Sequence, residues 1–195
     1  VLTGNRDFDD LLKKNMSSVW TVSPFEFCNA SLHKKLKNDP SYSFLYTTTE
    51  DGVTMLNLDR GGKKNDSNLY DRGFRIVSIP YCGGGPGDGR EAFLPLLISS
   101  IQDFVLQAMF SDGKAYSGLS YNNLGFLKNL HAKQKRIYIS ENDLGSPVGR
   151  CDPIVICSLN EADRIGTEKR EGAIVGFAVY PENPTGKSYF HIMLI

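Results

Sequence analysis

The stretch IVICSLNE at residues 154–161 carries the pattern that decides the fold, a short apolar strand followed at once by a helix start. Its first four letters are three β-branched residues and a cysteine, which is typical of a buried strand. The last four read Ser-x-x-Glu, in which the serine oxygen of Ser158 caps the helix and Glu161 reaches back to the cap amide. Strands that alternate with capped helices indicate an α/β fold.

The same alternation continues on both sides of this stretch. A β-rich run at 137–140 precedes it, the helix is expected to end near Glu171 before Gly172, and apolar runs at 174–180 and 188–195 flank a turn-rich tip. We therefore predict two strands, a crossover helix and a closing antiparallel hairpin. The stretch between the first two strands contains glycine and proline, which favours a loop.

The N-terminal residues show a similar order, which predicts an internal duplication. Val1–Thr3 and Val19–Val22 are interpreted as strands, with a helix between them, and Ser23–Glu26 repeats the Ser-x-x-Glu helix start. A hairpin over residues 42–58, turning at Asp51 and Gly52, completes the unit. The alternative is that the two halves share only a common pattern, since capped helices between strands also arise independently in α/β chains.

This pattern predicts a single α/β (or α+β) domain over residues 1–195, with a mixed sheet built from a degenerate duplicated β-α-β-α-β-β unit at 1–59 and 136–195. A helical insert at about 90–133 separates the two copies. Its first helix, from about Arg90 to Phe110, is apolar around most of its circumference. It contains too many polar residues for a membrane span. We expect a buried central helix, covered by a sheet and by other helices or a second copy in a homodimer.

The composition narrows the range of functions. Hydrophobic residues make up 41% and charged residues 23% of the chain, which is ordinary globular usage. Lys and Arg together number 22, as do Asp and Glu, so no global field attracts nucleic acid or a membrane surface. The chain opens at Val1 in an apolar run without Met, which indicates that an upstream segment was removed or left out and leans toward an exported protein.

Cysteine and histidine spacing predicts neither a metal site nor a cofactor. The four cysteines form no CxxC pair and no Cys/His cluster, and they leave the compartment and disulfide status open; they are Cys28, Cys82, Cys151 and Cys157. The three histidines are dispersed. Glu141, Asp143 and Asp152 lie around the end of a predicted strand, where α/β sheets often bind ligands, although loop solvation explains them equally well.

The best candidate site is the glycine-rich connection between a predicted strand and the long helix. Its backbone amides can approach an anion closely, a helix N-terminus adds partial positive charge, and Arg90 can make a bidentate contact. The spacing matches neither a dinucleotide-binding GxGxxG nor a Walker loop, and the alternative is a plain connection. The candidate ligand-binding residues are Cys82, Gly83, Gly85, Gly87 and Arg90.

Two functions follow from this loop. The leading prediction is a soluble, non-catalytic module that binds a small anionic ligand or a protein partner, in which Arg90→Ala weakens the ligand and leaves the fold intact. The alternative is a hydrolase or transferase that uses residues 82–90 as an anion or oxyanion site, with Cys82 as a nucleophile of lowered pKa or Arg90 as the clamp. Nucleic acid is not an expected partner of either.

Overall fold

The protein is described by a computed structural model over residues 1–62, 75–110, 135–144, 154–168, 170–183, 185–186 and 188–194. Its helices and strands, in chain order, are α1 (Arg6–Val19), α2 (Ala30–Leu36), β1 (Ser43–Glu50), β2 (Val53–Arg60), β3 (Arg75–Gly83), α3 (Leu94–Phe110), β4 (Arg136–Ser140), β5 (Ile154–Cys157), α6 (Leu159–Glu168), β6 (Ala173–Val179) and β7 (Tyr189–Leu194). The predicted mixed α/β class is confirmed at this level.

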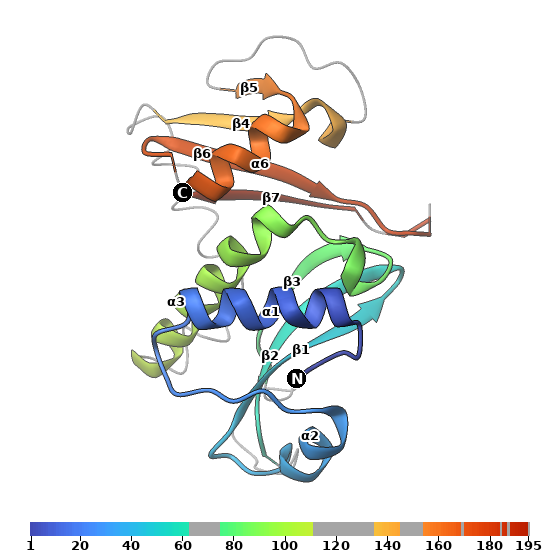
Figure 1. The fold of residues 1–195 in the computed structure, drawn as a ribbon, viewed down its shortest axis with the longest axis vertical. Helices are drawn as coiled ribbons and strands as arrows, with labels where there is room; N and C mark the ends of the chain where they lie inside the picture. The colour runs from blue at the N-terminus through green and yellow to red at the C-terminus, as the bar shows by residue number, and fades with distance from the viewer. Residues whose placement is uncertain are drawn as a thin grey trace.

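The strands form two sheets instead of the one predicted. The N-terminal sheet is antiparallel with the order β1-β2-β3, and the C-terminal sheet has the order β5-β4-β6-β7. In the second sheet β4 pairs in parallel with β5 and β6, whereas β7 is antiparallel to β6. Figure 1 shows α1 and α3 against the N-terminal sheet and α6 against the C-terminal one.

The prediction for the C-terminal half is confirmed in order and type. The strands, the crossover helix and the closing hairpin lie where their patterns place them, and the amide of Glu161 donates to the hydroxyl of Ser158 over 3.3 Å. This contact is the expected N-cap, which satisfies a helix amide that has no intrahelical partner. The predicted loop between β4 and β5 falls on residues 145–153, outside the described residues.

In the N-terminal half the two predicted strands are wrong. Val1–Thr3 is not part of a sheet, and Val19 is the last residue of α1, so Val19–Val22 is not a strand either. The physical reason is that the apolar face of α1, formed by Phe8, Leu12 and Met16, keeps its helical spacing up to Val19. A β-branched residue at the end of an amphipathic helix resembles the start of a strand when read locally.

The predicted helix start at Ser23–Glu26 is also wrong. The hydroxyl of Ser23 accepts a hydrogen bond from the Trp20 indole N–H over 3.1 Å, so it does not cap a helix. Helix α2 begins later, capped by Asn29, whose side chain accepts from the amide of Leu32 over 2.9 Å. Both halves contain a hairpin, but only the C-terminal half shows parallel strands, and the duplication remains a hypothesis.

The carbonyl group of Gly52 is one link between the two sheets. The β1–β2 hairpin turns through Asp51 and Gly52, both with positive φ, which is the two-residue turn that suits strand twist. The Gly52 oxygen accepts from the amide of Gly84, just after β3, over 3.0 Å and from the amide of Glu182, just after β6, over 2.9 Å. The ends of β3 and β6 are therefore held next to each other.

The hydrophobic core continues through both sheets. Leu97, Ile98 and Ile101 of α3 are fully buried in one cluster that also contains Leu56 of the first sheet and Val175 of the second. The N-terminal part of the long central helix is thus buried, as its sequence predicts, whereas Leu106 and Met109 toward its C-terminal end are exposed. The second predicted helix of the insert lies outside the described residues. None of the described helices is both long and apolar enough to cross a membrane.

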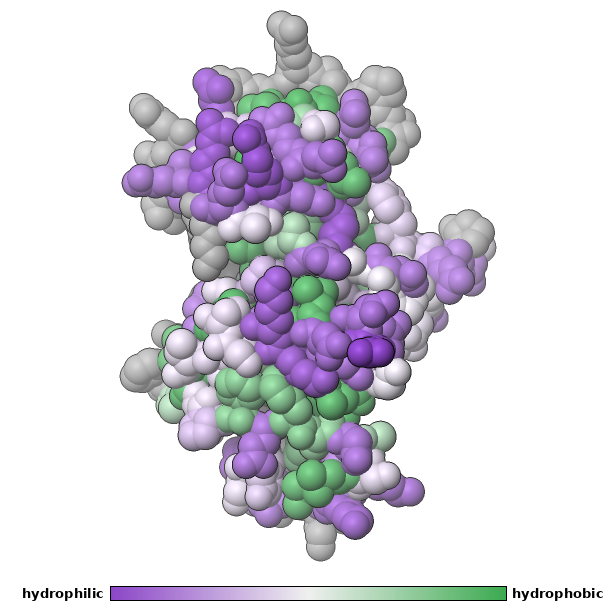
Figure 2. Space-filling model, viewed as in Figure 1, coloured by the Kyte–Doolittle hydropathy of each residue, from purple (hydrophilic) through white to green (hydrophobic). Residues whose placement is uncertain are grey.

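Exposed apolar side chains gather near α2. Figure 2 shows hydrophobic residues over α2 and the segment before it on this face, whereas hydrophilic residues dominate the upper part. Phe25 and Phe27 pack edge to face with ring centroids 5.5 Å apart. Leu32, on the following helix α2, is also exposed. This is the most apolar region on the visible face.

Candidate functional site

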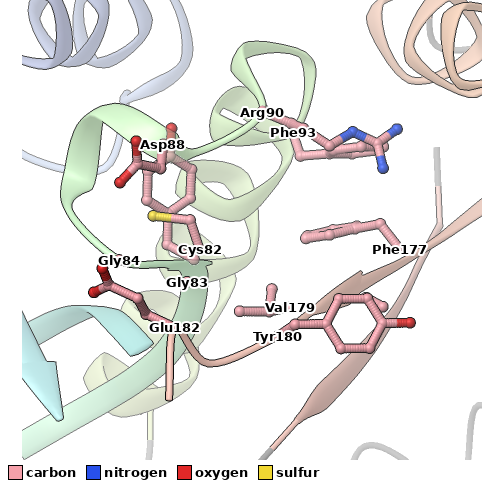
Figure 3. A pocket seen from close by; sticks show the side chains of 12 residues that line it. Cys82, Gly83, Gly84, Asp88, Arg90, Phe93, Phe177, Val179, Tyr180 and Glu182 are labelled. Carbon is pink, nitrogen blue, oxygen red and sulfur yellow. The ribbon is translucent and has the colours of Figure 1, made fainter. Parts of the chain in front are cut away.

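A cavity of about 550 Å³ lies where the end of β3 meets the end of β6 (Figure 3). This volume is within the range of small-molecule sites. The residues that line it are Tyr81, Cys82, Gly83, Gly84, Asp88, Arg90, Phe93, Phe177, Ala178, Val179, Tyr180 and Glu182. The cavity therefore combines the candidate loop with a C-terminal segment more than eighty residues further along the chain.

Three of the five predicted site residues line this cavity, namely Cys82, Gly83 and Arg90. Gly85 and Gly87 belong to the same loop but do not line it. Gly85 instead donates its amide to the Asp88 carboxylate over 2.8 Å, and a β-carbon at Gly87 would lie 2.7 Å from the Asn5 side chain. These two glycines shape the loop and pack it against the start of α1.

The loop does not open the long helix directly, contrary to the prediction. Short 3₁₀ turns at Pro86–Asp88 and Glu91–Phe93 follow β3, and α3 begins only at Leu94. Pro95 in the first turn of α3 fits this position, because its missing N–H has no helical partner there. The positive end of the α3 dipole is thus displaced from the glycines, and the expected helix N-terminal anion site does not form there.

A β-bulge at the end of β3 places Tyr81 beside the cavity. Thr54 pairs with Cys82 and Met55 pairs with Pro80, so Tyr81 is the extra residue. Its side chain is only 3% exposed, and its hydroxyl has no hydrogen-bond partner among the described residues. Burial raises the pKa of this phenol well above its ordinary value, so it stays neutral. An unpaired buried hydroxyl costs about 1–3 kcal/mol.

The Cys82 thiol is buried, and its surroundings disfavour the thiolate. Its sulfur donates to the Gly85 carbonyl over 3.1 Å, and burial, followed by the nearby Asp88 carboxylate, raises its pKa from 9.0 to about 11. The predicted lowered pKa is therefore wrong. Low dielectric surroundings and an adjacent negative charge both disfavour the thiolate.

We expect Cys82 to alkylate slowly in the native protein, because on the order of 1 in 10,000 such thiols is ionised at pH 7. Iodoacetamide labelling followed by mass spectrometry should modify half-buried Cys28 before Cys82. The rate of alkylation at Cys82 should keep rising as the pH is raised to about 11, the pKa of this thiol. Labelling in urea provides the control, and a native Cys82 that reacts as fast as Cys28 at neutral pH would restore the nucleophile hypothesis.

Arg90 is held by two carboxylates instead of facing the cavity as a free clamp. The Nη1 nitrogen of the guanidinium donates to the Asp143 carboxylate over 2.8 Å. Its Nη2 nitrogen and, over 3.0 Å, its Nε nitrogen both donate to the same carboxylate oxygen of Asp163. The guanidinium also lies 4.2 Å from the centre of the Phe93 ring. An arginine in this arrangement fixes neighbouring elements and has little capacity left for an anion.

The surroundings of the cavity carry excess negative charge. Asp88 and Glu182 line it, and Asp143 and Asp163 pair with Arg90, so the cavity and its immediate surroundings hold four carboxylates and one guanidinium. Asp143, at the end of β4, is one of the carboxylates that the sequence pointed to. Asp163 on α6 was missed, because 73 positions separate it from Arg90 and no local spacing links them. This balance disfavours the predicted anionic ligand.

Aromatic rings form the other end of the cavity. Phe93 and Phe177 stack with centroids 4.2 Å apart and ring planes 12° from parallel. Tyr180 follows β6, is 47% exposed, and donates its hydroxyl to the Asp143 carbonyl over 2.8 Å. In Figure 3 these rings lie away from Asp88 and Glu182, on the other side of Cys82. The cavity therefore has an acidic end and an aromatic end.

Within the described part of the chain, no group of three or more His, Cys, Asp or Glu side chains is arranged to hold a metal ion. The cavity's chemistry is thus carried by its carboxylates, aromatic rings, hydroxyls and backbone groups. Comparisons of the chain with protein-family models, with curated proteins and with solved structures found no match.

Proposed function

We propose that this domain is a non-catalytic module that binds a small organic ligand in the cavity between the ends of β3 and β6. The observation that carries the proposal is the convergence of polar and aromatic side chains from two sheets on one cavity of about 550 Å³. Mostly preformed concave sites with a few placed polar groups are typical of ligand-binding proteins. The shared Gly52 carbonyl supports such a preformed shape.

Binding is favoured over the hydrolase or transferase alternative by the state of two residues. A thiol nucleophile must ionise near neutral pH, and the Cys82 pKa of about 11 opposes this. An oxyanion or phosphate clamp needs free donors and an unbalanced charge, and Arg90 directs three of its five N–H donors to Asp143 and Asp163. Both residues contribute to the shape of the cavity. Cys82 is not in the state that a nucleophile needs, and Arg90 is not in the state that an anion clamp needs.

The proposal is tested with a library of aromatic fragments in a thermal-shift assay, because a ligand that binds only the folded state raises its melting temperature. Tyr180→Ala removes an aromatic wall of the cavity and should abolish most of the shifts, since such contacts contribute about 0.5–1.5 kcal/mol. Tyr42→Ala is the matched control, as Tyr42 is 46% exposed and does not line the cavity.

The hits should be confirmed by ligand-observed NMR with the same variants. Fragments that stabilise the native protein and Tyr42→Ala equally, but not Tyr180→Ala, support the site. Fragments that bind Tyr180→Ala undiminished would contradict the location, and a library without a single stabilising fragment would contradict the proposed function.

A further inference from the structure

We infer that the cavity takes an organic ammonium ion, with its charged head beside Asp88, Glu182 and Tyr81 and its apolar body toward Phe177 and Tyr180. This inference rests on the proposed function and specifies the class of ligand. It reverses the sign of the ligand charge that the glycine-rich loop alone predicts.

Two carboxylates from distant segments converge at Gly84. A β-carbon at this residue would lie 2.7 Å from a carboxylate oxygen of Asp88 and 3.9 Å from one of Glu182. Figure 3 shows both carboxylates on the Gly84 side of the cavity. Asp88 uses one oxygen to accept from the Gly85 amide, and Glu182 makes no ion pair with any described residue. An ammonium group placed there donates charge-assisted hydrogen bonds to both carboxylates.

Tyr81 provides a second, independent indication of a polar ligand group. Its unpartnered hydroxyl lies 2.3 Å from where a β-carbon of Gly89 would stand, so it lies against the loop residue that follows Asp88. Buried hydroxyls are almost always hydrogen-bonded, and an exception needs an explanation. A bound ammonium provides one, because the neutral phenol accepts a hydrogen bond from such a donor.

The arginine at the aromatic end does not oppose a cation. Its charge is balanced by Asp143 and Asp163, both within salt-bridge distance. The Phe93 ring is covered by Arg90 on one side and stacks with Phe177. The body of the ligand therefore meets chiefly the exposed ring of Tyr180, next to the almost fully buried Phe177, and a short linker connects it to the charged head.

Three probes of nearly equal shape test the charge: 2-phenylethylammonium, the neutral 2-phenylethanol and the anion 3-phenylpropanoate. Titration calorimetry on the full chain at neutral pH should give the tightest binding for the ammonium, by about tenfold over the alcohol, with the carboxylate weakest. Glu182→Gln should weaken the ammonium about fivefold and leave the alcohol unchanged. Glu171→Gln, an exposed glutamate that does not line the cavity, is the control.

Tyr81→Phe separates a ligand contact from a mere packing defect. It should raise the melting temperature of the unliganded protein, because an unpaired buried hydroxyl is removed, and it should weaken the ammonium severalfold. Unchanged ammonium affinity in Tyr81→Phe or in Glu182→Gln would overturn the inference, as would equal binding of the three probes. Equal binding that Tyr180→Ala abolishes would leave the proposed function standing. Failure of all three probes to bind would overturn the inference, and the fragment library would then decide the proposed function.

Discussion

Gly83→Ala is expected to lower the free energy of unfolding by about 2–3 kcal/mol, because no space exists for a side chain where β3 meets the segment after β6. A β-carbon on residue 83 would lie 1.9 Å from the Tyr180 carbonyl oxygen and 3.1 Å from its carbon. Both atoms belong to the backbone, so relief requires the two sheets to move apart. Urea unfolding followed by circular dichroism measures the loss as a lower midpoint.

Gly85→Ala is the matched control from the same loop. Its backbone has a negative φ, and the nearest atom to an added β-carbon is an Asp88 oxygen at 3.5 Å, which is an ordinary contact. Gly85→Ala should therefore leave the midpoint nearly unchanged. If Gly83→Ala were equally harmless, the close approach of the ends of β3 and β6 would be contradicted, and the cavity between them with it.

Arg90→Ala is expected to destabilise the fold by about 2 kcal/mol, a value between those of exposed and fully buried ion pairs. The Arg90 side chain is 22% exposed and that of Asp143 is 9% exposed, so the substitution leaves a shielded carboxylate without its partner. It also removes the guanidinium from the face of Phe93. This result differs from the intact fold that the loop sequence alone predicts.

The control for Arg90→Ala is Arg6→Ala, which breaks a surface pair with Asp10 at 4.0 Å and should leave the urea midpoint unchanged. Arg90→Lys keeps the charge but loses the forked geometry of the guanidinium. Its urea midpoint should therefore lie between those of Arg90→Ala and Arg6→Ala. An Arg90→Ala protein with native stability would contradict the bridging role and return Arg90 to consideration as a ligand clamp.

The fold was predictable where a local signal and the tertiary arrangement agree. Ser158 caps α6 and the following hairpin forms because each signal is read within a few residues. The prediction for the N-terminal half was wrong because two local signals are overridden by other contacts. Val19 resembles the start of a strand but ends α1, and Ser23 resembles a helix cap but accepts from the Trp20 indole. The separation into two sheets has no local signature, since it depends on which strands find each other in space.

The candidate site was predictable only in part. The glycine loop drew attention to Cys82, Gly83 and Arg90, all of which line the cavity. Asp88 belongs to the same loop, but the other charged partners come from elsewhere in the chain: Asp163 on α6 and the segment that carries Glu182. Because these partners are long-range, the sequence predicted an anion site, whereas the assembled cavity is lined by two carboxylates and by one guanidinium that is paired with two further carboxylates. The sign of a site's charge is a tertiary property.

A backbone amide NMR titration with 2-phenylethylammonium tests the central claim most directly. The ligand-binding account predicts saturable shifts that concentrate at the cavity, at Gly83, Gly84, Asp88, Tyr180 and Glu182. Amides of the exposed helix α2 should remain in place. An absence of shifts would contradict ammonium binding, and shifts that concentrate on α2 and the apolar segment before it would contradict a ligand site between β3 and β6.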